Sequence, residues 1–187
     1  MSMRKRNPMP RHEEDFYRTP WECTRSLLRV EPVAGQVWEP ACGDGMISRE
    51  LALVPGIELR STDLIDRGYG EVADFLEQRE AFTGTIFTNP PYKLASQFAL
   101  HSLAIGASKV VLLLRLSWLE GKKRKRQVFD KTPPSRVWVC SSRPTLWHGD
   151  DPAAQDTGGA ISYAWFVWDI GRTSKTTELL WIPPRTK

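Results

Sequence analysis

The sequence predicts an α/β domain with a mostly parallel central sheet and an antiparallel strand near one edge. Short β-rich runs alternate with helical patterns, which is typical of a parallel sheet covered by helices. The apolar run at 110–114 indicates a strand that is buried on both faces. Two late β-rich runs, 136–140 and 162–168, have no helix between them, so they should pair antiparallel as an edge hairpin.

Length and composition favour one globular domain. The chain has 187 residues, of which 41% are hydrophobic and 26% charged, so it can bury a core but not two well-packed ones. We expect the domain to span 15–182, between a flexible basic N-terminus at 1–14 and a short tail at 183–187. No apolar run approaches the length that crosses a bilayer, and no signal peptide is visible, so we expect a cytoplasmic protein without a membrane partner.

The first half of the chain is predicted to form a helix, a strand–turn–helix unit and further strands. Thr19 and Pro20 suit the start of a helix. Ile47, Leu51 and Val54 recur at helical spacing and mark the helix after the first strand. The expected elements are a helix at 21–30 and strands at 36–38, 57–62, 71–74 and 85–88.

The second half is predicted to hold two helices and four strands. The run at 119–130 is charged and helical in pattern, and Pro133 and Pro134 end it. The remaining elements are a helix at 94–105 and strands at 110–114, 136–140, 162–168 and 178–182.

A glycine turn between the first strand and its helix is the first candidate site. Gly43 and Gly45 let the backbone turn tightly and approach a ligand closely, although a plain strand–helix turn would look the same. Glu39 and Asp44 in this turn would repel a pyrophosphate but suit an ammonium or sulfonium group. The turn therefore points away from nucleotide phosphates.

Acidic residues after the next two strands extend this candidate site. Asp63 ends the second strand, where Rossmann-like sheets accept ribose hydroxyls, or it caps the following segment. Asp74 offers an acceptor for an exocyclic amine, and Phe75 offers a flat apolar face for a purine. A surface aspartate beside a core phenylalanine is the simpler interpretation of that pair.

The tetrapeptide Asn89-Pro90-Pro91-Tyr92 is the sharpest signal in the chain. The prolines hold the backbone rigid and leave carbonyl oxygens as acceptors, while Asn89 adds a side-chain acceptor. Two fixed acceptors can hold both hydrogens of a conjugated amino group and pull it toward tetrahedral geometry, which makes its nitrogen a better nucleophile. Tyr92 could stack on a target base that has left its duplex.

Together these segments resemble the S-adenosylmethionine-dependent DNA adenine-N6 methyltransferases, in particular small phage-encoded members in which the cofactor motif precedes Asn-Pro-Pro-Tyr. The segments at 15–20, 114–121, 142–144 and 164–169 are also similar to that family. The resemblance implies the Rossmann-like class I methyltransferase fold and direct methyl transfer from the cofactor to N6 of a flipped adenine. It implies a catalytic set of Asn89, Pro90, Pro91 and Tyr92, and a cofactor set of Tyr17, Thr19, Pro20, Glu39, Pro40, Ala41, Gly43, Asp63, Asp74 and Phe75.

The charge pattern points to nucleic acid as the partner. Net charge is +4, and much of the excess is clustered in one block of cations, which attracts polyanions but could also be a solvated helix face: Lys122, Lys123, Arg124, Lys125 and Arg126. Larger relatives carry a separate target-recognition domain, so we expect short or relaxed specificity here, read by loops at 121–134 and 145–159. Trp118 and Trp147, on predicted loops, are candidates for base stacking.

Several alternatives remain open. The same tetrapeptide suits methylation of RNA adenine, cytosine N4 or a protein glutamine, since each presents a planar conjugated amine. A nucleic-acid-binding module that has lost turnover is the non-enzymatic alternative. The cysteines are odd in number and scattered, and no histidine stands at ligand spacing from another histidine or a cysteine, so we expect reduced thiols and no metal.

Overall fold

The computed structural model describes residues 16–148, 161–172 and 176–184. The predicted N-terminal segment 1–14 lies outside these ranges, as do residues 149–159 of the predicted recognition loop and residues 185–187 of the tail. No helix in the described ranges is both long and apolar enough to cross a bilayer. The structure thus covers every predicted element and site residue.

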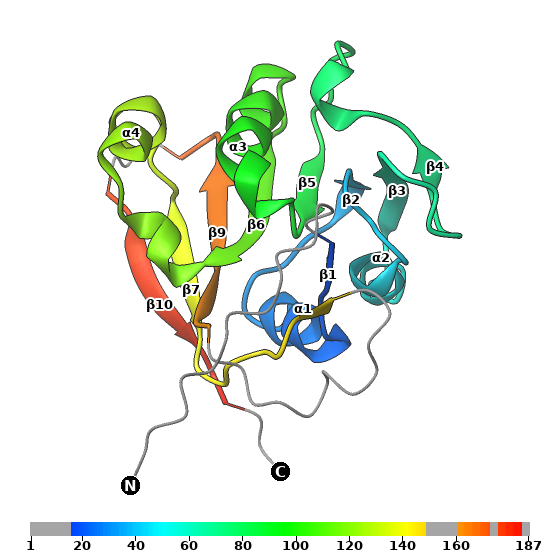
Figure 1. Cartoon of the computed structure of the whole chain (residues 1–187), viewed down its shortest axis with the longest axis horizontal. Coiled ribbons are helices and arrows are strands. Elements are labelled where there is room, and N and C mark those ends of the chain that lie inside the picture. Colours follow the sequence, from blue (N-terminus) through cyan, green and yellow to red (C-terminus); the bar gives the residue numbers. More distant parts are fainter. Residues whose placement is uncertain (1–15, 149–160, 173–175, 185–187) are drawn as a thin grey trace, which may run out of the picture.

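An eight-stranded sheet forms the centre of the molecule, in the order β10-β7-β9-β6-β5-β2-β3-β4 (Figure 1). Among the described strands of this sheet, β9 alone runs antiparallel to its neighbours, and all other pairs are parallel. This confirms the predicted α/β class. The strands are β2 Gly35–Glu39, β3 Ile57–Asp63, β4 Glu71–Val72, β5 Thr85–Thr88, β6 Lys109–Arg115, β7 Arg136–Cys140, β9 Tyr163–Asp169 and β10 Glu178–Ile182.

The predicted antiparallel pair exists, but it is not at the edge. β7 and β9 pair antiparallel, yet β9 also pairs with β6 along its whole length, from Lys109↔Asp169 to Arg115↔Tyr163. β10 then adds in parallel outside β7 and forms the edge. The predicted antiparallel strand near one edge is therefore confirmed in β9. The expectation that the β7–β9 pair itself forms the edge is wrong, because Ala164, Trp165 and Phe166 of β9 are fully buried and β10 lies outside β7.

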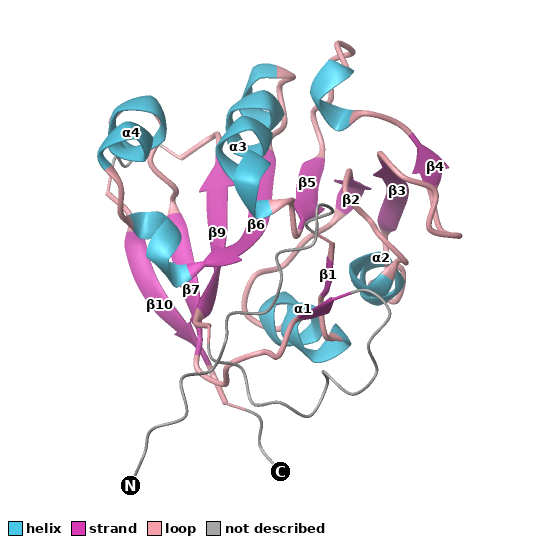
Figure 2. Ribbon diagram, viewed as in Figure 1, coloured by secondary structure: helices cyan, strands magenta, loops and turns pink. Residues whose placement is uncertain are grey.

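Helices cover both faces of the sheet because β6 is apolar on both sides (Figure 2). Val111 and Leu113 pack in the cluster that includes α1 (Trp21–Leu28) and α2 (Met46–Leu51). Leu112 and Leu114 pack in the opposite cluster, which includes α3 (Ala95–Ala104). The sheet is thus the middle of three layers.

The charged segment at 119–130 is not one regular helix. A 3₁₀ turn, Leu116–Leu119, precedes it, and Gly121, with a φ of 120°, separates that turn from α4 (Lys122–Arg124). The chain then continues as a π-helical turn, Lys125–Phe129. The backbone at Gly121 delays the start of the predicted helix, since few other residues adopt such a φ.

A buried ion cluster ties together the amino-terminal edge of the sheet. Glu31 is 3% exposed and accepts hydrogen bonds from Lys109 Nζ at 2.6 Å, Arg136 Nε at 2.8 Å and Trp138 Nε1 at 2.7 Å. Arg136 also bonds Asp169 at the end of β9. Burial raises the pKa of Glu31, but these hydrogen bonds outweigh it and hold that pKa below its usual value. The cluster links β6, β7 and β9 to the segment that follows α1.

A second, two-stranded sheet crosses the opposite edge. β1 (Tyr17–Arg18) pairs antiparallel with β8 (Trp147–His148), which joins the two ends of the first described range, 16–148. We call residues 16–20 the N-terminal strap. The sequence analysis did not predict either strand, because two residues carry no periodicity.

Candidate active site

The carboxyl ends of β2, β3 and β5 lie side by side because these strands are parallel and adjacent. A cavity of about 260 Å³ opens there, between the strand ends and the N-terminal strap. Seven residues of the predicted catalytic and cofactor sets line it: Tyr17, Thr19, Glu39, Ala41, Asp63, Asn89 and Pro91. Residues from four separate parts of the chain therefore meet in one cavity.

The glycine turn is held in place by Asp63. Gly43 has a φ of 55°, and its N–H donates to Asp63 Oδ2 at 2.8 Å. A Cβ on Gly43 would stand 2.3 Å from the ring of Phe16 in the strap. Only glycine fits between that ring and the turn, so the close approach at Gly43 is made by Phe16. The predicted approach of a ligand to this glycine stays a prediction.

Leu64 and Ile65, directly after Asp63, line the cavity but were not predicted from the sequence. Asp63 Oδ1 accepts from Ile65 N at 3.0 Å, which folds the chain back so that Leu64 and Ile65 line the cavity. Their side chains are 62% and 38% exposed. They offer the apolar surface expected from Phe75, and the only sequence signal is two large apolar residues directly after a strand-ending aspartate.

Glu39 is a buried carboxyl without a cationic partner among the described residues. It is 1% exposed and accepts a hydrogen bond from the Ser48 hydroxyl. Burial raises the pKa of Glu39 well above its usual value, and the nearby Asp63 adds to this. Cys42 lines the same cavity, and burial raises the pKa of its thiol to about 12, so it stays protonated at neutral pH.

Asn89 joins the strap to the end of β5. Its Nδ2 donates to Tyr17 O at 3.2 Å and to Thr19 Oγ1 at 3.0 Å. Both amide hydrogens are used, which fixes the orientation of the side chain. Asn89 Oδ1 is buried and has no hydrogen-bond partner in the described structure. An acceptor left in this state costs free energy unless a ligand satisfies it.

Tyr92 lies in an aromatic cluster beside Asn89. Its ring centroid is 5.8 Å from that of Tyr17 and 6.1 Å from that of Tyr163. The guanidinium of Arg115 lies over the Tyr92 ring, 4.8 Å from the centroid. Burial raises the pKa of the Tyr92 hydroxyl well above its usual value. Tyr92 is therefore a neutral ring at physiological pH, with a cation over it.

Comparisons with known proteins identify the fold. No protein-family model matches the sequence, and no curated protein matches it. Solved structures do match. A protein described as an RNA methyltransferase from Pyrococcus horikoshii has a TM-score of 0.61 at 16% identity over 86% of this chain and 88% of its own. The fold is the class I methyltransferase fold.

Two further solved structures share this methyltransferase fold. A protein described as an O-methyltransferase from Agrobacterium tumefaciens has a TM-score of 0.54 at 14% identity, over 87% of this chain and 84% of its own. A dimethyladenosine transferase from Plasmodium falciparum has a TM-score of 0.51 at 14% identity, over 78% of this chain and 60% of its own. Such identities establish the architecture and leave the site to be argued from its own residues.

Within this methyltransferase fold, some predicted site residues do not line the cavity. Phe75 is 2% exposed and packs edge-on against Trp38 in the core, with centroids 5.1 Å apart, so it cannot stack on a ligand as placed. Asp74 instead caps the short helix that follows it, by accepting from Leu76 N at 2.8 Å. The others that lie off the cavity are Pro20, Pro40, Gly43, Pro90 and Tyr92.

The two tryptophans proposed for base stacking are also buried. Trp118 is 6% exposed and packs edge-on against Phe166, and Trp147 is 9% exposed in β8. The expectation for Trp118 is therefore wrong, because the 3₁₀ turn after β6 carries this side chain into the core. Trp147 lines the larger cavity described below, and its stacking on a base stays a prediction.

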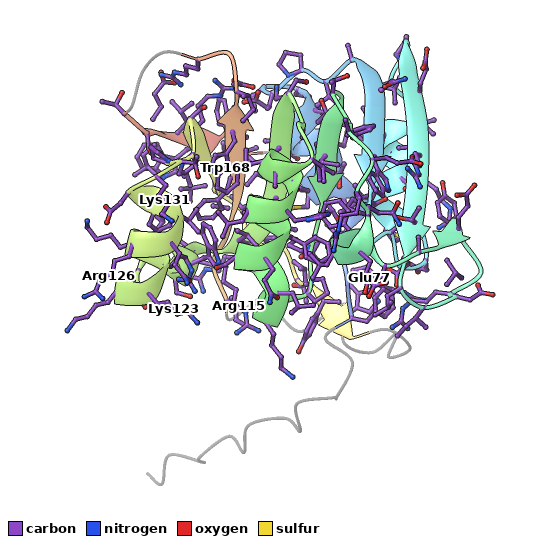
Figure 3. The ribbon with its side chains drawn as sticks, turned by 90° about the horizontal axis from the view of Figure 1, so that it is seen from above. Glu77, Arg115, Lys123, Arg126, Lys131 and Trp168 are labelled. Carbon is purple, nitrogen blue, oxygen red and sulfur yellow. The ribbon has the colours of Figure 1, made fainter. Side chains whose placement is uncertain are left out.

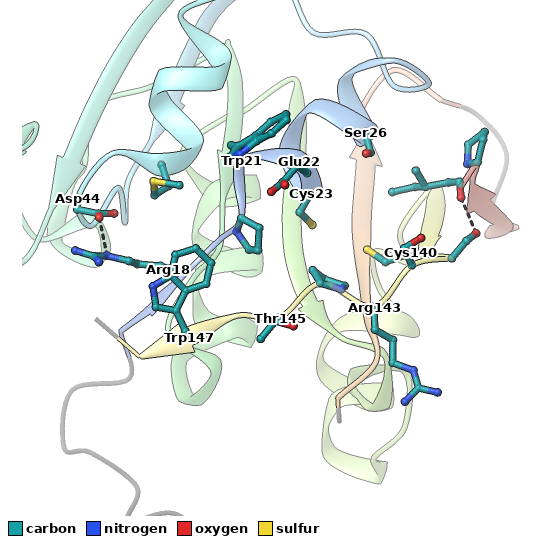
Figure 4. A pocket seen from close by; sticks show the side chains of 17 residues that line it. Arg18, Trp21, Glu22, Cys23, Ser26, Asp44, Cys140, Arg143, Thr145 and Trp147 are labelled. Atoms are coloured by element: carbon teal, nitrogen blue, oxygen red, sulfur yellow. Dashed lines mark hydrogen bonds and ion pairs between the residues drawn. The ribbon is translucent and has the colours of Figure 1, made fainter. Parts of the chain in front are cut away.

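A larger cavity, of about 570 Å³, adjoins the first one (Figure 4). It lies between α1 and the ends of β7 and β10. Arg18 and Asp44, joined by an ion pair of 2.7 Å, line both cavities. Pro20 of the strap and the thiol residues Cys23 and Cys140 line only the larger one.

The predicted basic block divides into bound and unbound cations. Arg124 Nη1 donates to Trp118 O at 2.7 Å, and its guanidinium lies 4.9 Å from the Trp118 ring. Lys125 pairs with Asp130 at 2.6 Å. Lys122, Lys123 and Arg126 are exposed and make no ion pair with a described residue, as Figure 3 shows for two of them. No group of acidic, histidine or cysteine side chains in the described chain is arranged to hold a metal.

Proposed function

We propose that the protein transfers a methyl group from S-adenosylmethionine to the exocyclic N6 of adenine in DNA. The observation that carries this proposal is Asn89 Oδ1, a buried acceptor without a partner at the end of β5, in a residue that lines the cavity together with Asp63 and Glu39. The class I methyltransferase fold is consistent with it.

One carboxylate of the cavity suits the proposed cofactor. Asp63 lines it and makes no ion pair with a described residue, and a carboxylate favours the sulfonium and ammonium groups of S-adenosylmethionine. Asp44 also lines the cavity but pairs with Arg18. When bound, the cofactor supplies a methyl group activated by its sulfonium. By the family resemblance, Asp63 would hold the ribose, and the strap residues Tyr17 and Thr19 would close over the methionine end.

The tetrapeptide supports an amine as the acceptor of the methyl group. Asn89 Oδ1 is one available oxygen. The Pro90 carbonyl is the second, since the described backbone hydrogen bonds of the tetrapeptide go to the carbonyls that follow it: Leu94 N donates to Pro91 O at 2.8 Å and Ala95 N donates to Tyr92 O. Two oxygens that hold both hydrogens of a conjugated amine localise its lone pair on nitrogen. Asn89 and Pro90 would thus orient and activate N6 without a strong base.

A polynucleotide is the proposed partner because of the exposed cations on α4 and the turn after it. Lys122, Lys123 and Arg126 can neutralise backbone phosphates and release counterions. The resemblance of the segments at 114–121 and 164–169 to phage-encoded enzymes favours DNA. A single strand or a flipped base is required, since N6 of a paired adenine is not accessible.

RNA adenine is the second candidate. Two solved structures with this fold are described as an RNA methyltransferase and a dimethyladenosine transferase, which favours RNA adenine over cytosine N4 and protein glutamine. A binding module without turnover has no use for an unpartnered acceptor at this position.

One assay separates these candidates. The full chain is incubated with methyl-labelled S-adenosylmethionine and, in parallel, duplex DNA, single-stranded DNA, RNA and protein, and the labelled product is digested to nucleosides or amino acids. We expect N6-methyldeoxyadenosine. Label in N6-methyladenosine from RNA would move the proposal to its second candidate, and binding of DNA without any label would favour the inactive module.

A further inference from the structure

Arg115 occupies a particular position next to the tetrapeptide. It is the last residue of β6, directly opposite Tyr163, the first residue of β9. Its guanidinium lies 4.8 Å from the centroid of the Tyr92 ring. The residues that come next, Leu116 and Ser162, are joined by a backbone hydrogen bond of 2.8 Å and line an open cavity of about 530 Å³. Arg115 therefore contacts the tetrapeptide and directly precedes, along the chain, the lining of that cavity.

The charge of Arg115 is not balanced within the described structure. Arg115 Nε is buried without a hydrogen-bond partner, and no described carboxylate forms an ion pair with the guanidinium. Other half-buried arginines differ: Arg136 is bonded to Glu31, and Arg18 to Asp44. A partly desolvated cation without an anion destabilises the fold, and the cost is recovered when an anion binds.

The neighbouring charges indicate which anion this is. Arg115 and the exposed Lys123 and Arg126 lie toward the same side of the molecule (Figure 3). Arg115 is not among the residues that line the cavity with Asp63, so it does not serve the proposed cofactor. A guanidinium can bind two phosphate oxygens through parallel hydrogen bonds. A backbone phosphate of a nucleic acid is thus the anion that suits this position.

The ring of Tyr92 cannot carry both a guanidinium and a base on the same face. We propose that Arg115 occupies the stacking position on Tyr92 until the target base takes it, and then binds the phosphate beside that base. This rests on the proposed function, since it assumes a nucleotide substrate. Arg115 is a positioning residue that couples entry of the base to a phosphate contact, and it selects a nucleotide over a free base or a peptide.

The test uses the full chain and the change Arg115→Gln. The probe is a short fluorescent strand of thymidines with one central adenine, titrated by anisotropy over a range of salt concentrations. A second strand carries neutral methylphosphonates on both sides of the adenine. Arg60→Gln is the control, because Arg60 also lies over an aromatic ring, 4.2 Å from the Trp38 centroid, but is on β3 away from the tetrapeptide.

We expect Arg115→Gln to weaken binding of the normal strand by roughly tenfold and to lower the salt slope by about one. It should have little effect on the methylphosphonate strand, and Arg60→Gln should affect neither strand. Arg115→Lys should keep the salt slope but lose part of the affinity, since lysine cannot bind two oxygens in a fixed fork.

The proposal is overturned if Arg115→Gln, with unchanged melting temperature, binds the normal strand like wild type or weakens both strands equally. If Arg115→Gln shifts the melting temperature, Arg115→Lys is tested instead. Loss of the salt slope of strand binding in Arg115→Lys would also overturn the proposal. Binding is measured without turnover, so absence of methyl transfer to DNA would remove the proposed function and leave this result standing.

Discussion

Two buried glutamates, one near the amino-terminal ends of the parallel strands and one at their carboxyl-terminal ends, differ in their hydrogen-bond partners and in the direction in which their pKa is shifted. Glu31, 3% exposed, receives hydrogen bonds from a lysine, an arginine and a tryptophan, and its pKa is lowered. Glu39, 1% exposed, receives one from a serine hydroxyl, and burial raises its pKa. The charge of Glu31 is balanced by cations of the chain, whereas Glu39 has no cationic partner among the described residues.

The same difference extends over each edge. At the amino-terminal ends of the strands, Asp169 forms ion pairs with both Lys109 and Arg136, and Arg136 also pairs with Glu31. At the carboxyl edge, Asn89 Oδ1, Tyr92 Oη and Arg115 Nε are buried without partners. Polar groups without partners lower stability, and these three lie next to one another at the proposed site, although others, such as Thr24 Oγ1 and His101 Nε2, lie elsewhere in the described structure. Changes at the two edges should therefore affect different properties.

The largest expected effect is on activity, from Asn89→Ala. Methyl transfer should fall by at least about a hundredfold, because one of the two oxygens that hold the amine is lost. Cofactor affinity, measured by calorimetry, should stay within a few-fold of wild type. A matched loss of both would mean that Asn89 acts only by tying down the strap.

Thr19→Val is the control for the contribution that Asn89 makes by holding the N-terminal strap. It removes the hydroxyl that accepts from Asn89 Nδ2 but keeps Asn89 Oδ1. We expect a loss of transfer of no more than about tenfold, which is the scale of one neutral hydrogen bond.

The next effect is on stability, from Glu31→Ala. This change leaves the partly buried Lys109 and Arg136 with Asp169 as their one remaining carboxylate among the described residues, and should cost about 3 kcal/mol in the free energy of unfolding. Glu39→Gln should instead leave stability unchanged or raise it, because a neutral amide is easier to bury. Urea unfolding of both variants measures this, and equal losses would abolish the contrast between the edges.

The two glutamates also predict opposite slopes of stability with pH. Glu31 has a lowered pKa when folded, so its contribution is present above its unfolded pKa and is lost as pH falls through the folded one. Glu39 has a raised pKa when folded, so stability falls as pH rises from the unfolded value toward the folded value. Glu39→Gln should remove the second slope and keep the first.

A third, smaller effect concerns the basic block. Within a few residues it contains both cations that are bonded to the chain and cations that make no ion pair with a described residue. Replacing Lys122, Lys123 and Arg126 together by glutamine should weaken DNA binding by about tenfold and flatten its salt dependence. Arg124→Gln should chiefly lower the melting temperature, since Arg124 holds the Trp118 and Glu120 carbonyls. A triple variant with wild-type salt dependence would exclude this block from the interface.

The smallest effect is on the pH dependence of cofactor binding. A bound sulfonium favours ionised Glu39, so binding should release a proton below the raised pKa of that carboxyl, and affinity should rise a few-fold with pH. Calorimetry in two buffers of different ionisation enthalpy counts the proton. Glu39→Gln should lose that release, and persistence of the release would assign it to another group.

Much of the fold follows from local patterns. The strands at Thr85–Thr88, Arg136–Cys140 and Glu178–Ile182 match the predicted ranges, because each is a β-rich run between clear breakers. The convergence of Asn89, Asp63 and Glu39 also follows, since Glu39 and Asp63 end parallel strands and Asn89 directly follows one. The hydrophobic periodicity and the positions of turn and breaker residues are sufficient to predict these features.

Features that depend on distant partners could not be predicted in this way. The β1–β8 pairing joins residues more than a hundred positions apart through two-residue strands. The burial of Phe75 depends on Trp38 and Phe98, and the charge balance of Glu31 depends on β6 and β7. A single sequence identifies such residues but does not reveal which of them find a partner.

The reversed direction of β9 has a practical consequence for engineering. The chain leaves the sheet at Cys140 and returns at Tyr163, and both positions stand at the carboxyl edge. A graft between them that keeps Trp147 and His148, which pair with β1, would not break any ladder of the large sheet. This connection is accordingly a place where segments can be exchanged without altering the large sheet.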